Sequence, residues 1–294
     1  MSDRDQVAGV TGLRIVTTAP HSSTESSGSS SESFSPVRHL PLNVWLTAPE
    51  GQSPAACANG CCMPVTGRLA RQLITTCSRV DDLVVDVHPA DHTLVANAVV
   101  LGRRVSTVVI DPAVAGVIWT RVTSGRSEAD RRRVEVRIAR AEATYVALAH
   151  RRGEAALVVI RRTCETESNA ISIGGPLQEL AEPAALLAPG GHLVVVTGLH
   201  LIQGRPRDPV PGLVREAQRA GLVYLQHIVA VHGPVRRRQI VLSLLPAQVA
   251  VRRTQAVSPH VPTALRAHAD VLIFSKPLTS PASVGPCPCG EENS

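Results

Sequence analysis

The stretch Leu83–Pro112, "LVVDVHPADHTLVANAVVLGRRVSTVVIDP", decides the fold. It starts with an apolar run, passes through a short polar loop into a segment with helical spacing, and returns to a second apolar run that ends in an acid. Short β-branched runs that are apolar throughout are typical of parallel strands covered on both faces. The stretch therefore predicts a strand–helix–strand unit, with Asp86 ending the first strand and Asp111 ending the second.

The same alternation continues along the chain. Further apolar runs at 155–160, 192–197, 222–231 and 268–277 predict strands, and segments with helical spacing at 93–102, 128–153, 176–191 and 211–221 predict helices. Strands that alternate with helices predict an α/β protein with a doubly wound, mostly parallel sheet and helices on both faces. The last strand, which follows a long excursion, could return antiparallel.

Composition suggests where the folded domain begins and ends. Residues 21–36 are mostly serine, which buries too little apolar area to offset chain entropy. We expect a disordered tail over 1–36, a domain over 37–278 in which Trp45 anchors the first segment, and a flexible tail over 279–294.

Charge and hydropathy narrow the function classes. The chain has 294 residues and a formal charge of +6 that comes almost wholly from arginine, while aromatic residues are only 2%. The charge is compatible with a nucleic-acid partner, possibly DNA, although a coding bias toward arginine would give the same count. No apolar run reaches the length of a membrane helix and no signal peptide is recognisable, so we expect a cytoplasmic protein without membrane contact.

Two arginine runs are candidates for phosphate contacts. Residues 131–133 lie among acids whose spacing favours ion pairs on a solvated helix face. The run 236–238, followed by Arg252 and Arg253, is less balanced by acids, and it is the better candidate.

The seven cysteines do not form a recognisable metal motif. Cys57, Cys61, Cys62, Cys77, Cys164, Cys287 and Cys289 lack two Cys-x-x-C pairs at regular separation. We expect reduced, free thiols and no metal site.

The loop over residues 88–92 contains no glycine. In open α/β sheets the ligand lies beyond the carboxyl ends of the strands, where glycine lets the first loop approach a cofactor. Ala90 and His92 occupy such positions here, whereas His88 can equally be a plain polar loop residue. We expect Thr93 to cap the following helix with its side-chain oxygen.

A family resemblance extends this interpretation. The string "VDDLVVDVHPADHTLVANAVVLGRRVSTVVIDP" resembles the opening of actinobacterial S-adenosylmethionine-dependent DNA methyltransferases of the N4-cytosine/N6-adenine type, whose pattern is roughly G-D-x-V-x-D-P-x-x-G-x-G-T. The segments "PVTGRLARQLI", "ALLAPGGHLVVVTG", "LVREAQRAGLVYLQHIVAVHGPV" and "HADVLIFSKP" are similar to other parts of that family in the same order. The resemblance covers about residues 40 to 277.

The resemblance implies a Rossmann-like class I methyltransferase fold, S-adenosylmethionine as cofactor and DNA as partner. Asp86 and Thr93 match the fixed acid and threonine of the cofactor motif, and Asp111 matches its ribose-binding acid. His88 and Ala90 lie within the same motif and complete the set of candidate cofactor-binding residues. Val87 replaces the proline of the pattern, and Ala90 and His92 replace its two glycines.

The catalytic motif of that family is absent from the expected place. A D/N/S-P-P-Y/F/W loop should follow the fourth strand, where it holds the target amine and stacks on the flipped base. Here Arg161, Arg162, Thr163 and Cys164 follow the run 155–160. An arginine pair could hold a phosphate, but it cannot accept a hydrogen bond from an amine, and no adjacent base marks Cys164 as a nucleophile.

Two hypotheses remain. The first is a nucleic-acid methyltransferase with a diverged pocket. The second, which the residues favour, is a methyltransferase-like protein with weakened or lost catalysis, or a non-catalytic nucleic-acid-binding or regulatory module on the same scaffold. Binding of S-adenosylmethionine separates them.

Overall fold

The computed structural model describes residues 13–14, 42–48, 65–162, 180–202, 205–233, 235–236, 239–240 and 268–278. The expected tail over 1–36 lies outside these residues except for Leu13–Arg14, and the expected tail over 279–294 lies wholly outside them. The second arginine run has only Arg236 within them, and Arg252 and Arg253 lie outside. None of the helices in the described part is long and apolar enough to span a bilayer.

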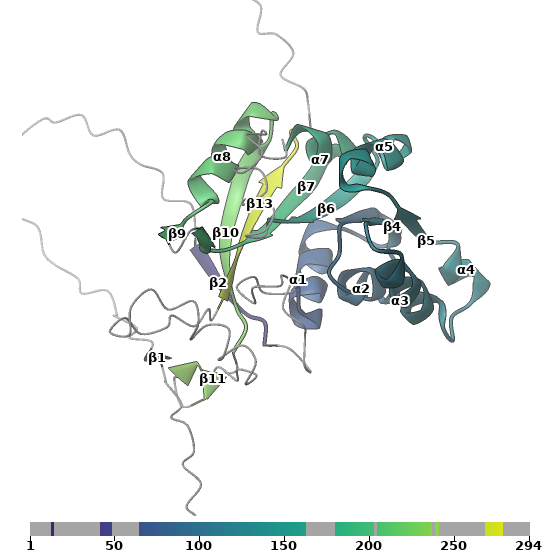
Figure 1. Cartoon of the computed structure of the whole chain (residues 1–294), viewed down its shortest axis with the longest axis horizontal. Coiled ribbons are helices and arrows are strands. Elements are labelled where there is room, and N and C mark those ends of the chain that lie inside the picture. The colour runs from purple at the N-terminus through teal and green to yellow at the C-terminus, as the bar shows by residue number, and fades with distance from the viewer. Residues whose placement is uncertain are drawn as a thin grey trace, which may run out of the picture.

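A mixed sheet forms the centre of the molecule (Figure 1). Among the described residues it has eight strands, in the spatial order β2 (Leu42–Leu46), β10 (Val223–Val231), β13 (His268–Ser275), β7 (Leu187–Thr197), β6 (Ala155–Arg161), β3 (Leu83–Val87), β4 (Arg104–Val109) and β5 (Val134–Ile138). Neighbouring strands are parallel except at β13, which pairs antiparallel with both β7 and β10. The predicted α/β class and the antiparallel return of the last strand are confirmed.

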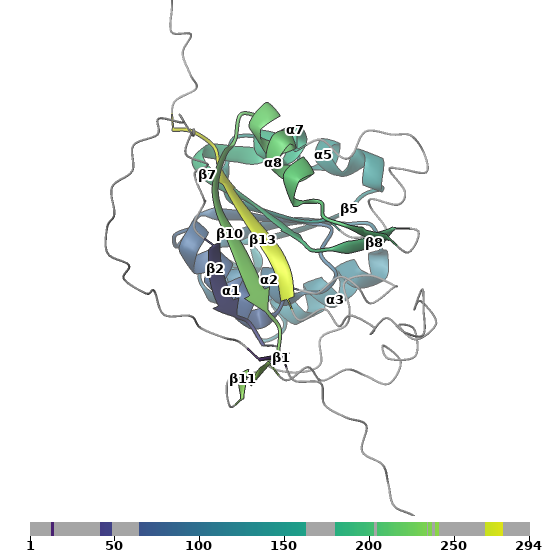
Figure 2. The same cartoon turned by 90° about the vertical axis from the view of Figure 1, so that its left-hand side faces the viewer.

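Helices cover both faces of the sheet, as Figures 1 and 2 show. They are α1 (Gly67–Cys77), α2 (Thr93–Val100), α3 (Pro112–Thr123), α4 (Glu128–Arg131), α5 (Thr144–Ala147), α7 (Ala181–Leu186) and α8 (Val210–Arg219), with 3-10 turns η1 (Ala141–Ala143) and η2 (Ala149–Arg151). Two short pairings accompany the sheet: β8 (His200–Ile202) with β9 (Arg205–Arg207), and β12 (Gln239–Ile240) with β1 (Leu13–Arg14) and β11 (Val235–Arg236).

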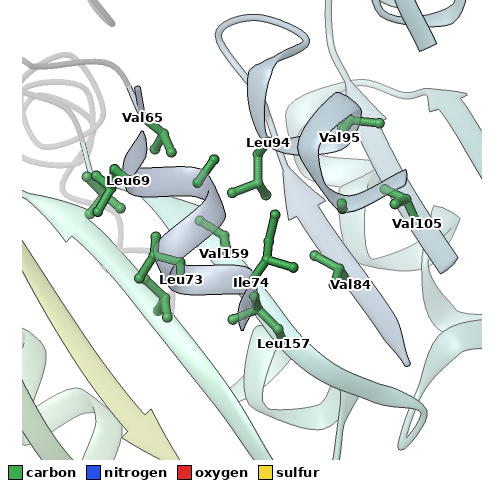
Figure 3. Packing of buried hydrophobic residues seen from close by; sticks show 14 of the residues in the cluster. Val65, Leu69, Leu73, Ile74, Val84, Leu94, Val95, Val105, Leu157 and Val159 are labelled. Carbon is green, nitrogen blue, oxygen red and sulfur yellow. The ribbon is translucent and has the colours of Figure 1, made fainter. Parts of the chain in front are cut away.

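Two apolar clusters, one on each face, stabilise this arrangement. On the first face, α1, α2 and α3 pack against the central strands through Leu, Ile, Val and Ala side chains. Figure 3 shows side chains of this cluster from α1, α2 and the strands beneath them. On the second face, α7 and α8 cover β6, β7 and β13 through residues such as Leu213 and Phe274. Trp45 packs against the first cluster, as predicted.

Two predicted helices were wrong in part. Segment 128–153 is helical only at α4, α5 and the two 3-10 turns, because β5 interrupts it. Val134 and Val136 alternate with charged residues and pair in parallel with β4, so a strand period of two overrides the helix-like spacing of the charges. In segment 176–191 the helix ends at Leu186, because Pro189 and Gly190, whose φ is +76°, cannot continue it.

Candidate functional site

The candidate site lies at the carboxyl ends of β3 and β6. The chain runs from β3 outward to β4 and β5, then returns to β6 on the other side of β3. The strand order therefore reverses between β3 and β6, and in open α/β sheets ligands bind beside such a reversal. Three of the five predicted site residues, His88, Ala90 and Thr93, belong to the loop and helix that follow β3.

A buried ion pair joins the two strands at this point. The side chain of Asp86 has no solvent exposure, and that of Arg161 is 8% exposed. Nη1 of Arg161 donates to Oδ1 of Asp86 at 2.6 Å, and Nη2 lies 3.4 Å from Oδ2. Complete burial raises the pKa of Asp86, and the charge and hydrogen bonds of Arg161 partly offset that rise. The acid that the resemblance assigns to cofactor binding therefore already has a cationic partner.

Arg161 is not fully satisfied by this pair. Its Nε is buried and has no hydrogen-bond partner among the described residues. A buried donor without an acceptor costs about 1–3 kcal/mol. The guanidinium therefore retains one unused donor beside the carboxyl ends of the strands.

The loop after β3 keeps its turn without glycine. His88 has a φ of +49°, in the left-handed region that glycine enters most readily. Its Nε2 lies 2.6 Å from Oγ1 of Thr144, a fully buried residue at the start of α5. Burial, and secondly the charge of Arg161, lower the pKa of His88. His88 is therefore a structural residue of the loop as well as a candidate for ligand contact.

The start of α2 differs from the prediction. Thr93 is the first residue of the helix and does not cap it, and the residue at the cap position, His92, makes no side-chain cap bond. Oδ1 of Asp91 accepts the hydrogen bond from the Thr93 backbone nitrogen at 2.8 Å, because Asp91 lies two residues earlier in an Asx turn. Ala90 is exposed.

Asp111 was predicted to end the second strand, but β4 ends two residues earlier, at Val109, and Asp111 caps α3. Its Oδ1 accepts from the backbone nitrogen of Ala113 at 2.8 Å, and Pro112 fills the first helical position. The residue is exposed. Unlike Asp86, it has no cationic partner among the described residues, so its carboxylate remains accessible to a ligand.

Arg162, the first residue after β6, has a structural role. Arg162 is buried, and its Nη2 donates to Oε2 of Glu216 on α8 at 3.1 Å. Because Arg161 and Arg162 pair with acids, the sequence-based idea that they hold a phosphate together is not supported. Thr163 and Cys164 lie outside the described residues.

The cysteines add no metal centre to this part of the chain. Cys77 ends α1 inside the first apolar cluster, where burial raises its pKa to about 12. The described residues contain no group of three or more His, Cys, Asp or Glu side chains that could hold a metal ion. The clusters around Cys57 and Cys287 lie outside them.

Sequence reasoning missed the partners of the site residues. An arginine at the end of a buried strand needs an acid, and Asp86 was the buried acid at the matching strand end, so that signal was present. Nothing in the sequence pointed to Thr144, because the segment around it was interpreted as one long helix.

Comparison with known proteins finds similarity among solved structures. No protein-family model matches the sequence, and a search of the curated proteins finds no match. Among solved structures, the chain is similar to a Bacillus halodurans protein assigned as a methyltransferase, with 11% identity, 71% of this chain and 98% of that chain covered, and a TM-score of 0.48. It is also similar to a Methanosarcina mazei protein described as a SAM-dependent methyltransferase, with 14% identity, 70% and 97% covered, and a TM-score of 0.43.

A third similar structure is that of Haemonchus contortus phosphoethanolamine N-methyltransferase 2 in complex with S-adenosyl-L-methionine. The identity is 11%, the alignment covers 73% of this chain and 53% of that chain, and the TM-score is 0.49. Within the described residues, the chain's own strand order gives a doubly wound, mostly parallel α/β sheet in which β13 lies antiparallel between β7 and β10.

Proposed function

We propose that this protein is a methyltransferase-fold protein that binds S-adenosylmethionine or a related adenosine compound weakly, and that it does not methylate base amines. The observation that carries the proposal is the ion pair of Asp86 with Arg161 at the point where the strand order reverses. This pair engages both Asp86, the acid of the cofactor motif, and Arg161, the first residue of the expected catalytic segment.

The residues present fit one end of S-adenosylmethionine and not the other. Asp111 is exposed and has carboxylate oxygens that can accept hydrogen bonds from ribose hydroxyls. The methionine end carries a carboxylate and two positive groups, a sulfonium and an ammonium, and an unpaired acid would be the natural partner of the positive groups. Asp86 cannot serve in that way while Arg161 is bonded to it. We therefore derive no methyl-transfer step from this site.

The arginines at the end of β6 also support a loss of chemistry. Holding an exocyclic amine for methyl transfer requires acceptors, and guanidinium groups only donate. Arg161 and Arg162 have no acceptor to offer, and both are engaged by acids. The protein would then use its ligand as a signal or as a structural component.

The proposed partner is duplex DNA, bound without sequence preference. The formal charge of +6 supports it. The arginine run 131–133 contributes little, since Arg132 pairs with Glu128 at 3.4 Å and Arg133 with Asp81 at 2.6 Å. Any DNA contact would therefore depend mainly on the arginines at 236–238 and 252–253.

Calorimetry and a transfer assay together test this function. Titration with S-adenosylmethionine should give weak binding that Asp111→Asn reduces, because asparagine keeps the helix cap but removes the carboxylate charge. Incubation with labelled S-adenosylmethionine and unmethylated duplex DNA should leave the DNA unlabelled. Label on base amines would overturn the proposed loss of catalysis. Absence of S-adenosylmethionine binding would overturn the proposed ligand binding.

A further inference from the structure

The strand β2 forms one edge of the eight-stranded sheet of the described residues, with β10 as its neighbour (Figure 2). Its sequence, Leu42–Leu46, contains no charged residue and no proline. Val44 is 59% exposed and Leu46 is 48% exposed, although both side chains are apolar. An edge strand presents unpaired backbone groups, and natural proteins usually protect such edges with charged residues or proline. β2 carries neither.

The opposite edge of the sheet, formed by β5, is protected in this way. Glu135 and Arg137 of β5 are bonded to each other. Glu135 is also bonded to His150 and Arg151 of η2, at 3.1 Å and 3.0 Å. A strand that added to β5 would have to bury some of these charges, which is costly. The two edges therefore differ, and β2 is the one that favours association.

The backbone of β2 faces β10 and the open edge in turn. The backbone nitrogen of Thr47 donates to the carbonyl oxygen of Val231 at 2.8 Å. Successive residues of a strand direct their N–H and C=O groups to opposite sides, so every second residue before Thr47 faces β10 in the same way. The backbone groups of Leu42, Val44 and Leu46 therefore face the open edge.

The side chains of Val44 and Leu46 lie on the same face of the sheet. Trp45, between them, packs against the first apolar cluster, and side chains alternate along a strand. Val44 and Leu46 therefore point to the face on which α7 and α8 lie, but they remain exposed there. Apolar side chains and unpaired backbone groups thus occur together at this edge.

We infer that two copies of this protein pair through β2, with the two strands antiparallel and Val44 at the two-fold axis. In this register Val44 lies opposite the partner's Val44, and Leu46 lies opposite the partner's Leu42. All of these residues have outward-facing backbone groups, so the two strands exchange hydrogen bonds and the two sheets become continuous. The inference is independent of the proposed ligand and of the proposed DNA partner.

Charge favours a second copy at this edge. A two-fold contact uses the same surface on both subunits, so any charge at its centre would meet its own copy. Two chains with a formal charge of +6 repel each other overall, and the contact therefore suits a strand that adds no charge of its own. A five-residue strand buries less than the roughly 800 Å² per partner of a standard interface, so the dimer should dissociate reversibly on dilution.

Sedimentation velocity of the full chain tests the inference, over concentrations from about 1 to about 300 µM, the range that suits a weak, reversible dimer. Val44→Lys and Val44→Glu each place two like charges opposite one another, whereas an equimolar mixture of the two variants places opposite charges there. Val80→Lys is the matched control, because Val80 is 63% exposed in the turn before β3, away from β2. Thermal unfolding of each variant checks that it is folded.

The wild-type protein and Val80→Lys should form dimers with the same dissociation constant. Val44→Lys and Val44→Glu, measured separately, should each raise that constant at least about tenfold, because a like-charge pair replaces an apolar pair. The mixture should recover the dimer. Added salt should weaken the dimer of the mixture and leave the wild-type dimer unchanged, because only the former depends on charge.

A wild-type protein that stayed monomeric at the highest concentration would overturn the inference even if no variant folded, and it is also the result expected if another part of the chain covers β2. Dimers that survive both changes at Val44, or an equal loss in Val80→Lys, would overturn it as well. A mixture that stayed monomeric would contradict the position of Val44 at the axis, and species larger than a dimer would contradict the two-fold contact.

Discussion

The Nε2 atom of His88 lies 2.6 Å from Oγ1 of Thr144, a residue 56 positions further along the chain. The Thr144 hydroxyl also lies 3.4 Å from the carbonyl oxygen of Arg140. If it donates there, its oxygen accepts from the imidazole. This contact attaches the loop after β3 to α5, so the shape of the loop depends on a distant segment.

Replacing Thr144 with valine should weaken this attachment. The variant leaves the half-buried His88 nitrogen without its partner, which we expect to lower the free energy of unfolding by about 1–2 kcal/mol. Chemical denaturation measures the change. Thr144→Ser is the control, since it keeps the hydroxyl. If valine and serine destabilise the protein equally, packing of the methyl group explains the effect and the hydrogen bond does not.

Arg161→Met should lower the free energy of unfolding much more than replacement of an exposed arginine would. It leaves the buried Asp86 carboxylate unpaired, and removal of one partner from a buried ion pair costs about 3–5 kcal/mol. Adding Asp86→Asn should recover part of the loss, because no buried charge then remains. Urea denaturation measures the free energy of unfolding of both variants. A double variant less stable than Arg161→Met alone would contradict the expected recovery.

Glycine in the loop should strengthen ligand binding only while Asp111 is charged. We expect the double change Ala90→Gly and His92→Gly to increase affinity for S-adenosylmethionine, because the backbone gains freedom to approach it. Asp111→Asn in that background should abolish the gain, since separate surface effects would simply add. Calorimetry of the four combinations measures this coupling. If neither change alters affinity, the loop is only a connection between β3 and α2.

Glu135 should make stability depend on acid pH. Burial raises its pKa, but hydrogen bonds from Arg137, His150, Arg151 and Ser106 outweigh this and lower the pKa to about 2. An unfolded glutamate has a pKa of about 4.3. The folded value is lower, so the stabilisation is complete above the unfolded pKa and is lost as pH falls toward about 2.

The measurement for Glu135 compares wild type with Glu135→Gln between pH 2 and 7. The difference in unfolding free energy should be constant near neutral pH, at no more than about 1 kcal/mol because solvent screens the cluster, and should shrink below about pH 4.3. Glu128→Gln, which affects an exposed pair with Arg132, is the control. If the difference in unfolding free energy between wild type and Glu135→Gln grew as the pH fell, the pKa of Glu135 would not be lowered by folding, and the prediction would be refuted.

DNA binding, if present, should weaken steeply with salt. The evidence for it is arginine charge and not a recognisable reading helix, so binding would be driven by counterion release. Fluorescence anisotropy with two unrelated duplexes at increasing salt should give parallel, falling affinities. Replacing Arg236, Arg237 and Arg238 with glutamine should reduce the salt dependence, whereas the same change at 131–133 should have a smaller effect. Affinity that was unchanged from low to high salt would argue against DNA as the partner.

The sequence was informative about the strands and less so about their partners. Runs such as Ala155–Ile160 are apolar throughout, which is typical of a strand buried on both faces, and they were predicted correctly. β5 was missed because its charged residues also fit helical ion pairs. An arginine at the end of a buried strand indicates that an acid lies nearby, but the partner of Asp86 was missed because local spacing does not encode that β3 and β6 are neighbours in the sheet.

The position of β13 has a consequence for how the chain is synthesised. β2 and β10 connect to the remaining strands only through β13, within the described residues, and Thr47 donates from its backbone nitrogen to Val231, 184 residues later. During translation, β3 to β7 can assemble early, while β2 emerges first but has no route to that assembly. A ribosome must pass residue 275 before the two parts can join. Nascent chains stalled before His268 should therefore expose the β7 edge and be degraded or aggregate.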